Sequence, residues 1–297
     1  MTAGLPAAVA AALAGAVTPA LAATVAAALT APALADTLPA PGTAPPLVEA
    51  ARARNTAAAL DLIESGAEVG ASVDAAAPNG TTALHWAAHY GDEVLVRALL
   101  DAGARADVAN AFGATPIAEA ALIGSVPILE MLLGAGVDAD TANAEGQTPL
   151  MVVARAGNVE AAKLLLEHGA DVGAIERWGG QNALMWAAAQ SQADMVALLV
   201  EHGADPDVRG AERNWQRRVT SEPRKKDMHD GGFAPLHYAA REGCLDCVAP
   251  LLAAGADIDI TDPDRVTPLN LAIQNGHFDL ARALIEAGAD VDKWDFF

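Results

Sequence analysis

One short phrase, built around Pro-Leu at its start and Ala-Ala at its end, returns six times along the chain. The interval between copies is 33 or 34 residues, except for one interval of 52. The copies begin at Thr82, Thr115, Thr148, Asn182, Ala234 and Thr267. About twenty residues after each comes a glycine that opens a second motif, Gly-Ala-Asp in most copies: Gly103, Gly136, Gly169, Gly203, Gly255 and Gly288. A fixed period of this kind predicts a solenoid, in which each unit buries its apolar face against its neighbours.

A single unit predicts two helices. The hydroxyl of Thr148 can cap a helix whose first position is Pro149, where no N–H is needed. This helix should end near Gly157, and a second helix should follow over 158–168. Gly169 can then adopt the left-handed conformation that ends it.

These phrases resemble the ankyrin repeat, whose signature is Thr-Pro-Leu-His-x-Ala at a period of 33 residues. The resemblance implies an all-α ankyrin-repeat solenoid of about seven helix-turn-helix units, joined by β-hairpin-like fingers, over 47–297. The first unit is atypical, and Arg52, Arg54, Asp61 and Glu64 should give it the polar outer face of a cap. The expected units are 47–79, 80–112, 113–145, 146–178, 179–210, 231–264 and 265–297.

The N-terminal segment 1–35 holds no charged side chain and ends in Ala33-Leu34-Ala35, a small-x-small cleavage pattern. We expect a signal peptide, a bacterial protein exported to the periplasm, and a mature chain that begins at Asp36. Two alternatives stay open: an uncleaved membrane anchor or an Ala-rich tail from a misassigned start codon. A Pro-rich linker over 36–46 should follow.

Composition and motifs argue against several functions. The formal net charge of −20 makes nonspecific binding to nucleic acid or an anionic membrane by the whole body unfavourable. A membrane is an expected partner only if residues 1–35 stay uncleaved. We find no Ser-His-Asp order, phosphate loop or zinc-protease motif, so we expect no enzyme activity and no cofactor. His168 and His202 recur at one register position, too far apart on stacked helices to share a metal.

The two cysteines form a Cys-x-x-Cys motif, Cys244 to Cys247. Their register places them at the start of a second helix, where we favour core thiols or a local disulfide after export. The alternative is a redox pair, because a helix N-terminus lowers the pKa of a thiol.

The resemblance also implies where a partner protein binds. In the ankyrin family partners usually dock on the concave face, formed by the finger tips and the ends of the first helices. Carried over by register, this surface should include His89, Tyr90, Phe112, Leu122, Ile123, Arg155, Trp178, Gln190, Arg241 and Glu242. The alternative for its large apolar members is that they fold back onto neighbouring repeats. Trp86, Trp186 and Tyr238 should serve in packing.

The 52-residue interval holds about 19 extra residues, which we place in a basic loop over 211–230. Residues 209–230 carry a net charge of about +3 within an acidic chain. The loop should dock onto the acidic body or, alternatively, contact an anionic partner. Its key residues are Arg213, Trp215, Arg217, Arg218, Arg224, Lys225 and Lys226.

Together these features predict a protein–protein interaction module whose partner is another protein, with no nucleic acid expected. One alternative is a structural or inhibitory subunit that stabilises an exported enzyme. Another is a thiol-exchange accessory that uses Cys244 and Cys247. The last repeat keeps an internal apolar pattern, and Trp294, Phe296 and Phe297 follow it. We therefore expect either further repeats beyond Phe297 or an end that pairs with another molecule.

Overall fold

The computed structural model of the protein describes residues 44–65, 72–217 and 226–293, with the backbone alone for 213–217 and 226–230. The chain divides into two units, 1–40 and 41–297, and the described residues all belong to the second. The expected signal segment, most of the linker, the tip of the basic loop and the last four residues lie outside these ranges. Within them, no helix is both long and apolar enough to cross a membrane.

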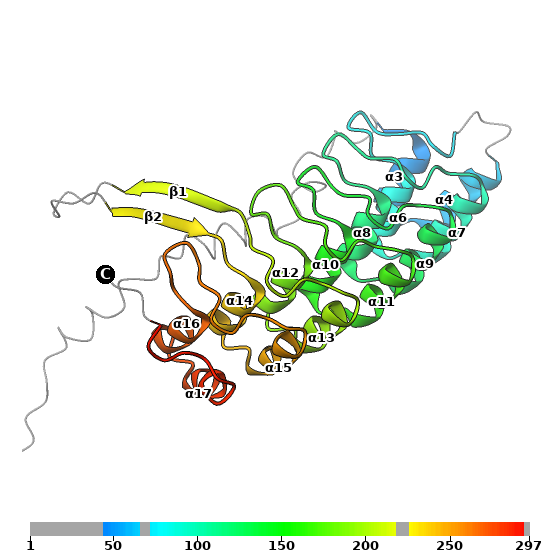
Figure 1. The fold of residues 1–297 in the computed structure, drawn as a ribbon. Helices are drawn as coiled ribbons and strands as arrows, with labels where there is room; N and C mark the ends of the chain where they lie inside the picture. Colours follow the sequence, from blue (N-terminus) through cyan, green and yellow to red (C-terminus); the bar gives the residue numbers. More distant parts are fainter. Residues whose placement is uncertain (1–43, 66–71, 218–225, 294–297) are drawn as a thin grey trace, which may run out of the picture. The chain divides into compact units, whose positions relative to one another are not determined.

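The described residues form fourteen helices in seven consecutive pairs, which confirms the predicted solenoid (Figure 1). The first helices of the pairs pack side by side in sequence order and make one layer. Their bounds are α3 Pro46–Arg52, α6 Ala83–Tyr90, α8 Pro116–Ile123, α10 Pro149–Ala156, α12 Ala183–Ala189, α14 Pro235–Glu242 and α16 Pro268–Gln274.

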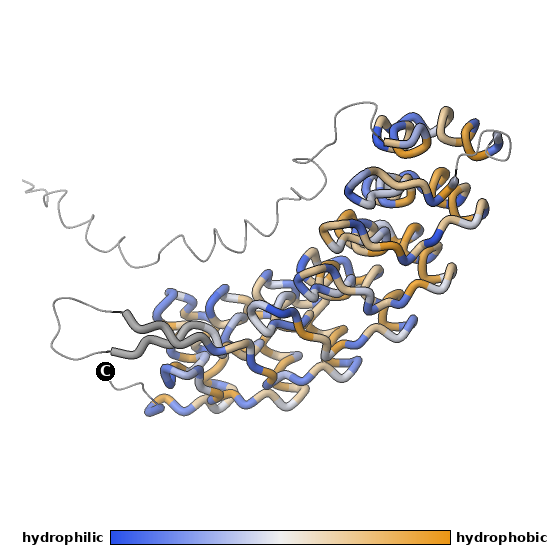
Figure 2. Tube along the Cα trace, turned by 90° about the horizontal axis from the view of Figure 1, so that it is seen from above, coloured by the Kyte–Doolittle hydropathy of each residue, from blue (hydrophilic) through white to orange (hydrophobic). Residues whose placement is uncertain are grey.

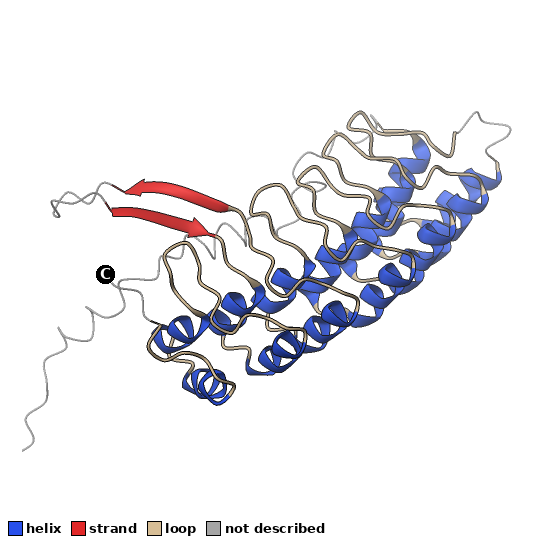
Figure 3. Cartoon of the chain, viewed as in Figure 1, coloured by secondary structure: helices blue, strands red, loops and turns tan. Residues whose placement is uncertain are grey.

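The second helices make a parallel layer in the same order, and each pairs with the first helix of its own repeat (Figure 3). Their bounds are α4 Thr56–Glu64, α7 Glu93–Asp101, α9 Val126–Gly134, α11 Val159–Glu167, α13 Ala193–Glu201, α15 Leu245–Ala253 and α17 Phe278–Glu286. Each unit therefore contacts only its neighbours, as expected of a solenoid.

Local signals place the helix ends where the sequence predicts them. In α10 the hydroxyl of Thr148 accepts a hydrogen bond from the backbone N–H of Met151 at 3.4 Å, and Pro149 occupies the first turn. Gly157 ends the helix with φ of +72°, a left-handed conformation that glycine adopts without a steric penalty. The second helix begins one residue later than predicted and ends one residue earlier.

Small and branched apolar side chains fill the space between the layers. The Ala-Ala pair that ends four of the six repeated phrases is buried, for example Ala87, Ala88, Ala187 and Ala188. Figure 2 shows the apolar residues concentrated along the helices, while the fingers mix apolar and polar residues. Alanine at these positions lets neighbouring first helices approach closely, so the stack is held by repeat-to-repeat packing instead of one central core.

The fingers are closed by a recurring pair of hydrogen bonds. In one finger the backbone N–H of Asn110 donates to the carbonyl of Ala114 at 2.9 Å, and the Asn110 side chain accepts from Ala114 at 3.0 Å. Glu176 replaces asparagine in the finger that is one residue longer, and it accepts from the backbone N–H of Gln181 at 3.0 Å. The additional residue in this finger accounts for the single 34-residue interval. The extra methylene of glutamate lets its carboxylate reach across that residue.

The inserted segment replaces the tip of the finger between the fifth and sixth repeats. The N–H of Gly210 donates to the carbonyl of Phe233 at 3.1 Å, in the register of Asn110 and Ala114. The insertion therefore runs over 211–232, where the other finger has only residues 111–113 between the same two partners.

The prediction of a loop is wrong for most of this segment, because β1 Glu212–Arg217 and β2 Lys226–Gly231 form an antiparallel hairpin (Figure 3). The finger already brings its two chain segments together. Extending their antiparallel pairing outward satisfies the backbone N–H and C=O groups of the inserted residues. Figure 1 shows both strands running outward past the neighbouring fingers. Docking of the basic side chains onto the acidic body stays a prediction, since those side chains lie outside the description.

Candidate partner-binding surface

The concave face carries large apolar side chains that the stack does not bury. Leu122 and Ile123, in the last turn of α8, are 41% and 43% exposed. Phe112 and Trp178, at the tips of two fingers, are 37% and 69% exposed. By contrast Trp86, Trp186 and Tyr238 are buried in the packing between repeats. Apolar groups of this size on a wet surface are typical of interaction sites.

Tyr90 differs from the exposed apolar residues of the predicted surface, because it is half-buried. Its ring stacks on Trp86 with centroids 5.6 Å apart, and the guanidinium of Arg54 lies 5.1 Å from its centroid. Tyr90 thus follows the alternative in which the side chain folds back onto its neighbours. Arg54 was not predicted to take part, and its place just past the first helix of the atypical first repeat gave no signal for it.

His89 pairs with a buried carboxylate from the next repeat. Its Nδ1 lies 2.9 Å from Oε2 of Glu119 on α8, and Glu119 is almost fully buried. Glu119 stands in the register position that Trp86 occupies one repeat earlier. That unusual acid in a packing position was the available sequence signal. The pairing fixes the His89 ring at the edge of the concave face.

The fourth to sixth repeats share a continuous group of side chains, which we name the Arg–aromatic platform: Arg155, Gln181, Trp186, Tyr238 and Arg241. The guanidinium of Arg155 lies 5.1 Å from the Trp186 ring, and Arg241 lies 5.1 Å from the Tyr238 ring. Gln181 joins the two rings, because it accepts from Trp186 Nε1 at 3.0 Å and donates to the Tyr238 hydroxyl at 2.5 Å. Sequence register placed the two arginines on this surface but gave no sign of Gln181.

The two arginines of the platform differ in their acidic neighbours. Arg241 donates through Nε to Glu242 at 2.7 Å. Arg155 is half-buried, and among the described residues no carboxylate lies within ion-pair distance of its guanidinium. Burial lowers the pKa of the Arg155 guanidinium. The remaining predicted residue of this group, Gln190, lies exposed just past the end of α12.

Two buried histidines brace neighbouring repeats and do not line the surface. Nδ1 of His85 accepts from the backbone N–H of Thr82 at 3.2 Å, and its Nε2 donates to the carbonyl of Ala114 in the next repeat at 3.0 Å. His237 makes the same bonds to Ala234 and Val266, at 3.2 Å and 3.1 Å. Both rings are held neutral, because burial lowers the pKa of His85 and lowers that of His237 to about 4.

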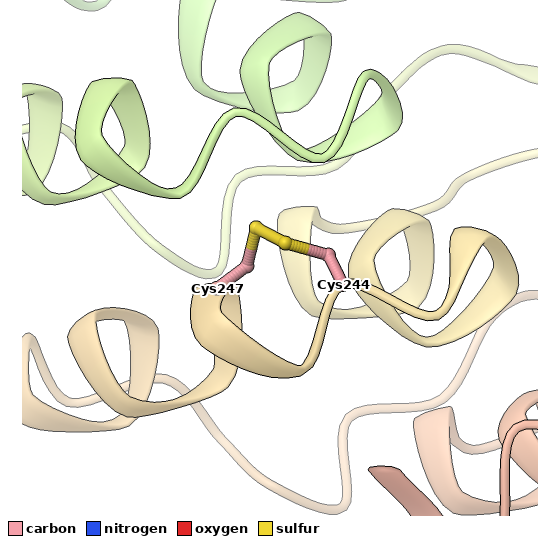
Figure 4. Close-up of a disulfide and its surroundings, with 2 residues drawn as sticks. All are labelled: Cys244 and Cys247. Atoms are coloured by element: carbon pink, nitrogen blue, oxygen red, sulfur yellow. A yellow bond between two sulfur atoms is a disulfide. The ribbon is translucent and has the colours of Figure 1, made fainter.

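Cys244 and Cys247 are joined by a disulfide across the first turn of α15 (Figure 4). Cys244 occupies the position before the helix, and Cys247 lies one turn later and is fully buried. Thiol exchange requires an attacking thiolate to reach one sulfur. Since both residues are buried, this geometry favours a structural role over the redox alternative.

Within the ranges that the structure describes, no three His, Cys, Asp or Glu side chains come together as a metal site would require. The ring of His202 instead lies with Nδ1 2.9 Å from the carbonyl of Leu198, at the end of α13. This carbonyl also accepts the backbone N–H of His202 at 3.1 Å, so the ring adds a second contact at the helix end.

Fold and surface together define a helical repeat protein whose exposed features suit binding. The family model "Ankyrin repeats (3 copies)" matches residues 47–143, 119–210 and 218–295. The chain therefore belongs to the ankyrin repeat family. Ankyrin repeats are protein–protein interaction modules, and members of the family are typically not enzymes.

Solved ankyrin domains share this architecture. The human ASB11 ankyrin repeat domain is 25% identical with a TM-score of 0.66, and the match covers 82% of this chain and 98% of that one. The ankyrin repeat domain of Bcl-3, described as a unique member of the IkappaB protein family, is 28% identical with a TM-score of 0.62. That match covers 80% of this chain and 97% of the Bcl-3 domain. No curated protein sequence matches the chain.

Proposed function

We propose that this protein binds a partner protein through its concave face, with Leu122, Ile123, Phe112 and Trp178 as apolar anchors. The observation that carries this proposal is the exposure of Leu122 and Ile123 at the end of α8. The fourth repeat has Arg155 and Ala156 in the same register. The stack leaves a large part of two adjacent aliphatic side chains exposed there, and a partner would bury that part.

The test compares two faces of the stack. The first variant combines Leu122→Ser, Ile123→Ser and Trp178→Ala. The control combines Val94→Ser and Phe278→Ser, which remove apolar side chains of the second-helix layer that are more exposed than Leu122 and Ile123. The partner is first captured from an extract of the native host, identified by mass spectrometry and purified, and its affinity is measured by calorimetry.

We expect the concave-face variant to lose about 2 kcal/mol of binding free energy, roughly thirtyfold in affinity, while the control binds like the wild type. Loss of binding in the control alone would move the site to the second-helix layer. Equal binding by both variants would refute the concave face. If the partner is an exported enzyme that binding stabilises or inhibits, the protein is a subunit of that enzyme.

We also propose that the protein is exported. The uncharged apolar segment 1–35 and its Ala33-Leu34-Ala35 end support this proposal, as does the disulfide of Cys244 and Cys247, since disulfides persist in oxidising compartments. N-terminal sequencing of the protein from its native host should find Asp36 first. A soluble cytosolic form that retains Met1 or Thr2 would contradict export.

A further inference from the structure

The strongest unexplained feature of the molecule is the pair of arginines on the Arg–aromatic platform. The chain holds 38 Asp and Glu residues against 18 Lys and Arg. Arg52, Arg105 and Arg282 each pair with a carboxylate. Arg155 has none within reach among the described residues, although it is half-buried and so less able to be solvated by water.

The surroundings of Arg155 suit a ligand better than a simple packing role. A guanidinium held over an aromatic ring gains cation–π attraction and keeps its five N–H donors for another partner. No acceptor among the described residues takes a hydrogen bond from the Arg155 guanidinium. A carboxylate matches the fork of these donors, and the Trp186 ring fixes the guanidinium that would receive it.

Arg241 provides a second cation at a defined step along the stack. Arg155 lies over the ring of Trp186 on α12, and Arg241 lies over the ring of Tyr238 on α14. Because neighbouring helices pack about 8–10 Å apart, the two rings lie one such step apart along the stack. Gln181 holds the two rings in this arrangement from between them.

We propose that the Arg–aromatic platform binds an extended, acidic segment of the partner protein, with carboxylates of that segment held by Arg155 and Arg241. The inference rests on the proposed binding function and adds the chemistry of the partner. The charge of the platform identifies the ligand. The acidic body as a whole would attract a basic partner, whereas the two cations of the platform select carboxylates. Glu242 competes for Arg241, so Arg155 is the stronger of the two contacts.

The test uses a fluorescein-labelled peptide of ten glutamates as probe and fluorescence anisotropy as readout, at about 0.15 M salt, where screening limits repulsion by the acidic body. An uncharged Gly-Ser peptide of the same length is the reference. The variants are Arg155→Gln alone and together with Arg241→Gln. The matched control is Arg105→Gln with Arg282→Gln, which removes two exposed arginines that lie away from the platform. Thermal unfolding of each variant establishes that it is folded.

We expect the glutamate peptide to bind and the reference not to bind. Arg155→Gln should reduce the affinity at least about fivefold, and the double variant should reduce it further. The control should lose less than twofold, and Arg155→Lys should bind less well than the wild type because it loses the planar fork.

Three results would overturn the inference: no binding of the peptide, binding insensitive to Arg155→Gln, or tighter binding of a ten-nucleotide oligothymidylate. A variant with Arg217, Arg218, Arg224, Lys225 and Lys226 changed to Gln separates the hairpin from the platform. If only that variant loses the peptide, the hairpin is the acidic site and the platform is not. Failure here leaves the proposed function standing, provided that capture of the partner still depends on Leu122 and Ile123.

Discussion

The two repeats on either side of the hairpin solve the same structural problem in opposite ways. The fifth repeat caps α12 with Asn182, whose side chain accepts from the N–H of Met185 at 2.9 Å. The sixth begins α14 after Ala234, which has no side-chain acceptor, and His237 binds the Ala234 N–H instead. At the far end of the first helix, the fifth repeat has Ser191 where the sixth has Gly243.

The difference shows that a repeat tolerates the loss of a signature residue when another residue of the same repeat supplies the missing hydrogen bond or packing. Met185 fills the signature position with apolar volume and makes no bond to the next repeat, so its repeat depends on the asparagine cap. His237 joins its repeat to the next through Val266, so its repeat tolerates alanine at the cap. At this register position the histidine should make the sixth repeat sensitive to acid, whereas the methionine of the fifth repeat carries no titratable group.

The largest expected effect is the acid sensitivity of the sixth repeat. His237 has an ordinary pKa of 6.5 and a folded pKa of about 4, so the unfolded chain binds the proton first. Stability should therefore fall as pH drops from about 6.5 to 4, by roughly 3 kcal/mol from this residue. Above pH 6.5 the residue contributes no pH dependence.

Urea unfolding of wild type and His237→Met over this pH range measures the effect. Methionine is the matched replacement, because Met185 is fully buried in the same register. The difference between the two proteins should be constant above pH 6.5 and change by up to about 3 kcal/mol by pH 4. Parallel stability curves for the two proteins would contradict the predicted contribution of His237. Any acid sensitivity that remains in His237→Met includes the contribution of His85.

The next effect concerns the cap of the fifth repeat. Asn182→Ala should destabilise the protein by about 1 kcal/mol, because the N–H of Met185 loses its acceptor in a buried position. Asn182→Thr restores the residue that Thr148 supplies one repeat earlier, and it should recover most of the loss. Chemical denaturation near pH 8 measures both, and an unchanged stability in Asn182→Ala would mean that the cap is not needed.

Ser191→Gly should stabilise the protein by about 0.5–1 kcal/mol. Ser191 has φ of +56°, in the left-handed region, whereas Gly243 takes φ of +76° in the same register. Glycine removes the steric penalty that serine carries there. The same change made at half-buried Ser125, which is the residue before α9 and has φ of −78°, should not stabilise and serves as the control. Destabilisation by Ser191→Gly would show that the serine side chain has a structural role.

The smallest effect is expected at the missing cap of the sixth repeat. Ala234→Thr should stabilise by about 0.5 kcal/mol, less than a usual cap, because His237 already serves the Ala234 N–H. Thr82 has the same relation to His85, with the hydroxyl 2.8 Å from Nδ1, so a threonine fits beside this ring. Measured in the His237→Met background, the same change should stabilise by about 1 kcal/mol. Equal effects in both backgrounds would contradict the idea that the histidine replaces the cap.

The period, the caps and the helix-ending glycines could all be predicted, because each depends on residues close together in the sequence. Thr148, Pro149 and Gly157 define where one helix begins and ends through contacts within that helix. Whether a large side chain at the end of a first helix packs on its neighbours or stays exposed could not be predicted in this way. Tyr90 folds onto Trp86 and under Arg54, while Leu122 and Ile123 stay exposed in equivalent places. The outcome depends on which residues the neighbouring repeat presents.

The sequence by itself determined the solenoid, its seven repeats and the position of the insertion, because a repeated pattern dictates repeated local structure. Only the tertiary structure decided that the insertion pairs into a hairpin and that Gln181 joins Trp186 to Tyr238. Gln181 and Tyr238 are separated by 57 positions, with the hairpin between them. Contacts across such a separation form only when the repeats stack. They therefore cannot be predicted from the spacing of residues along the chain.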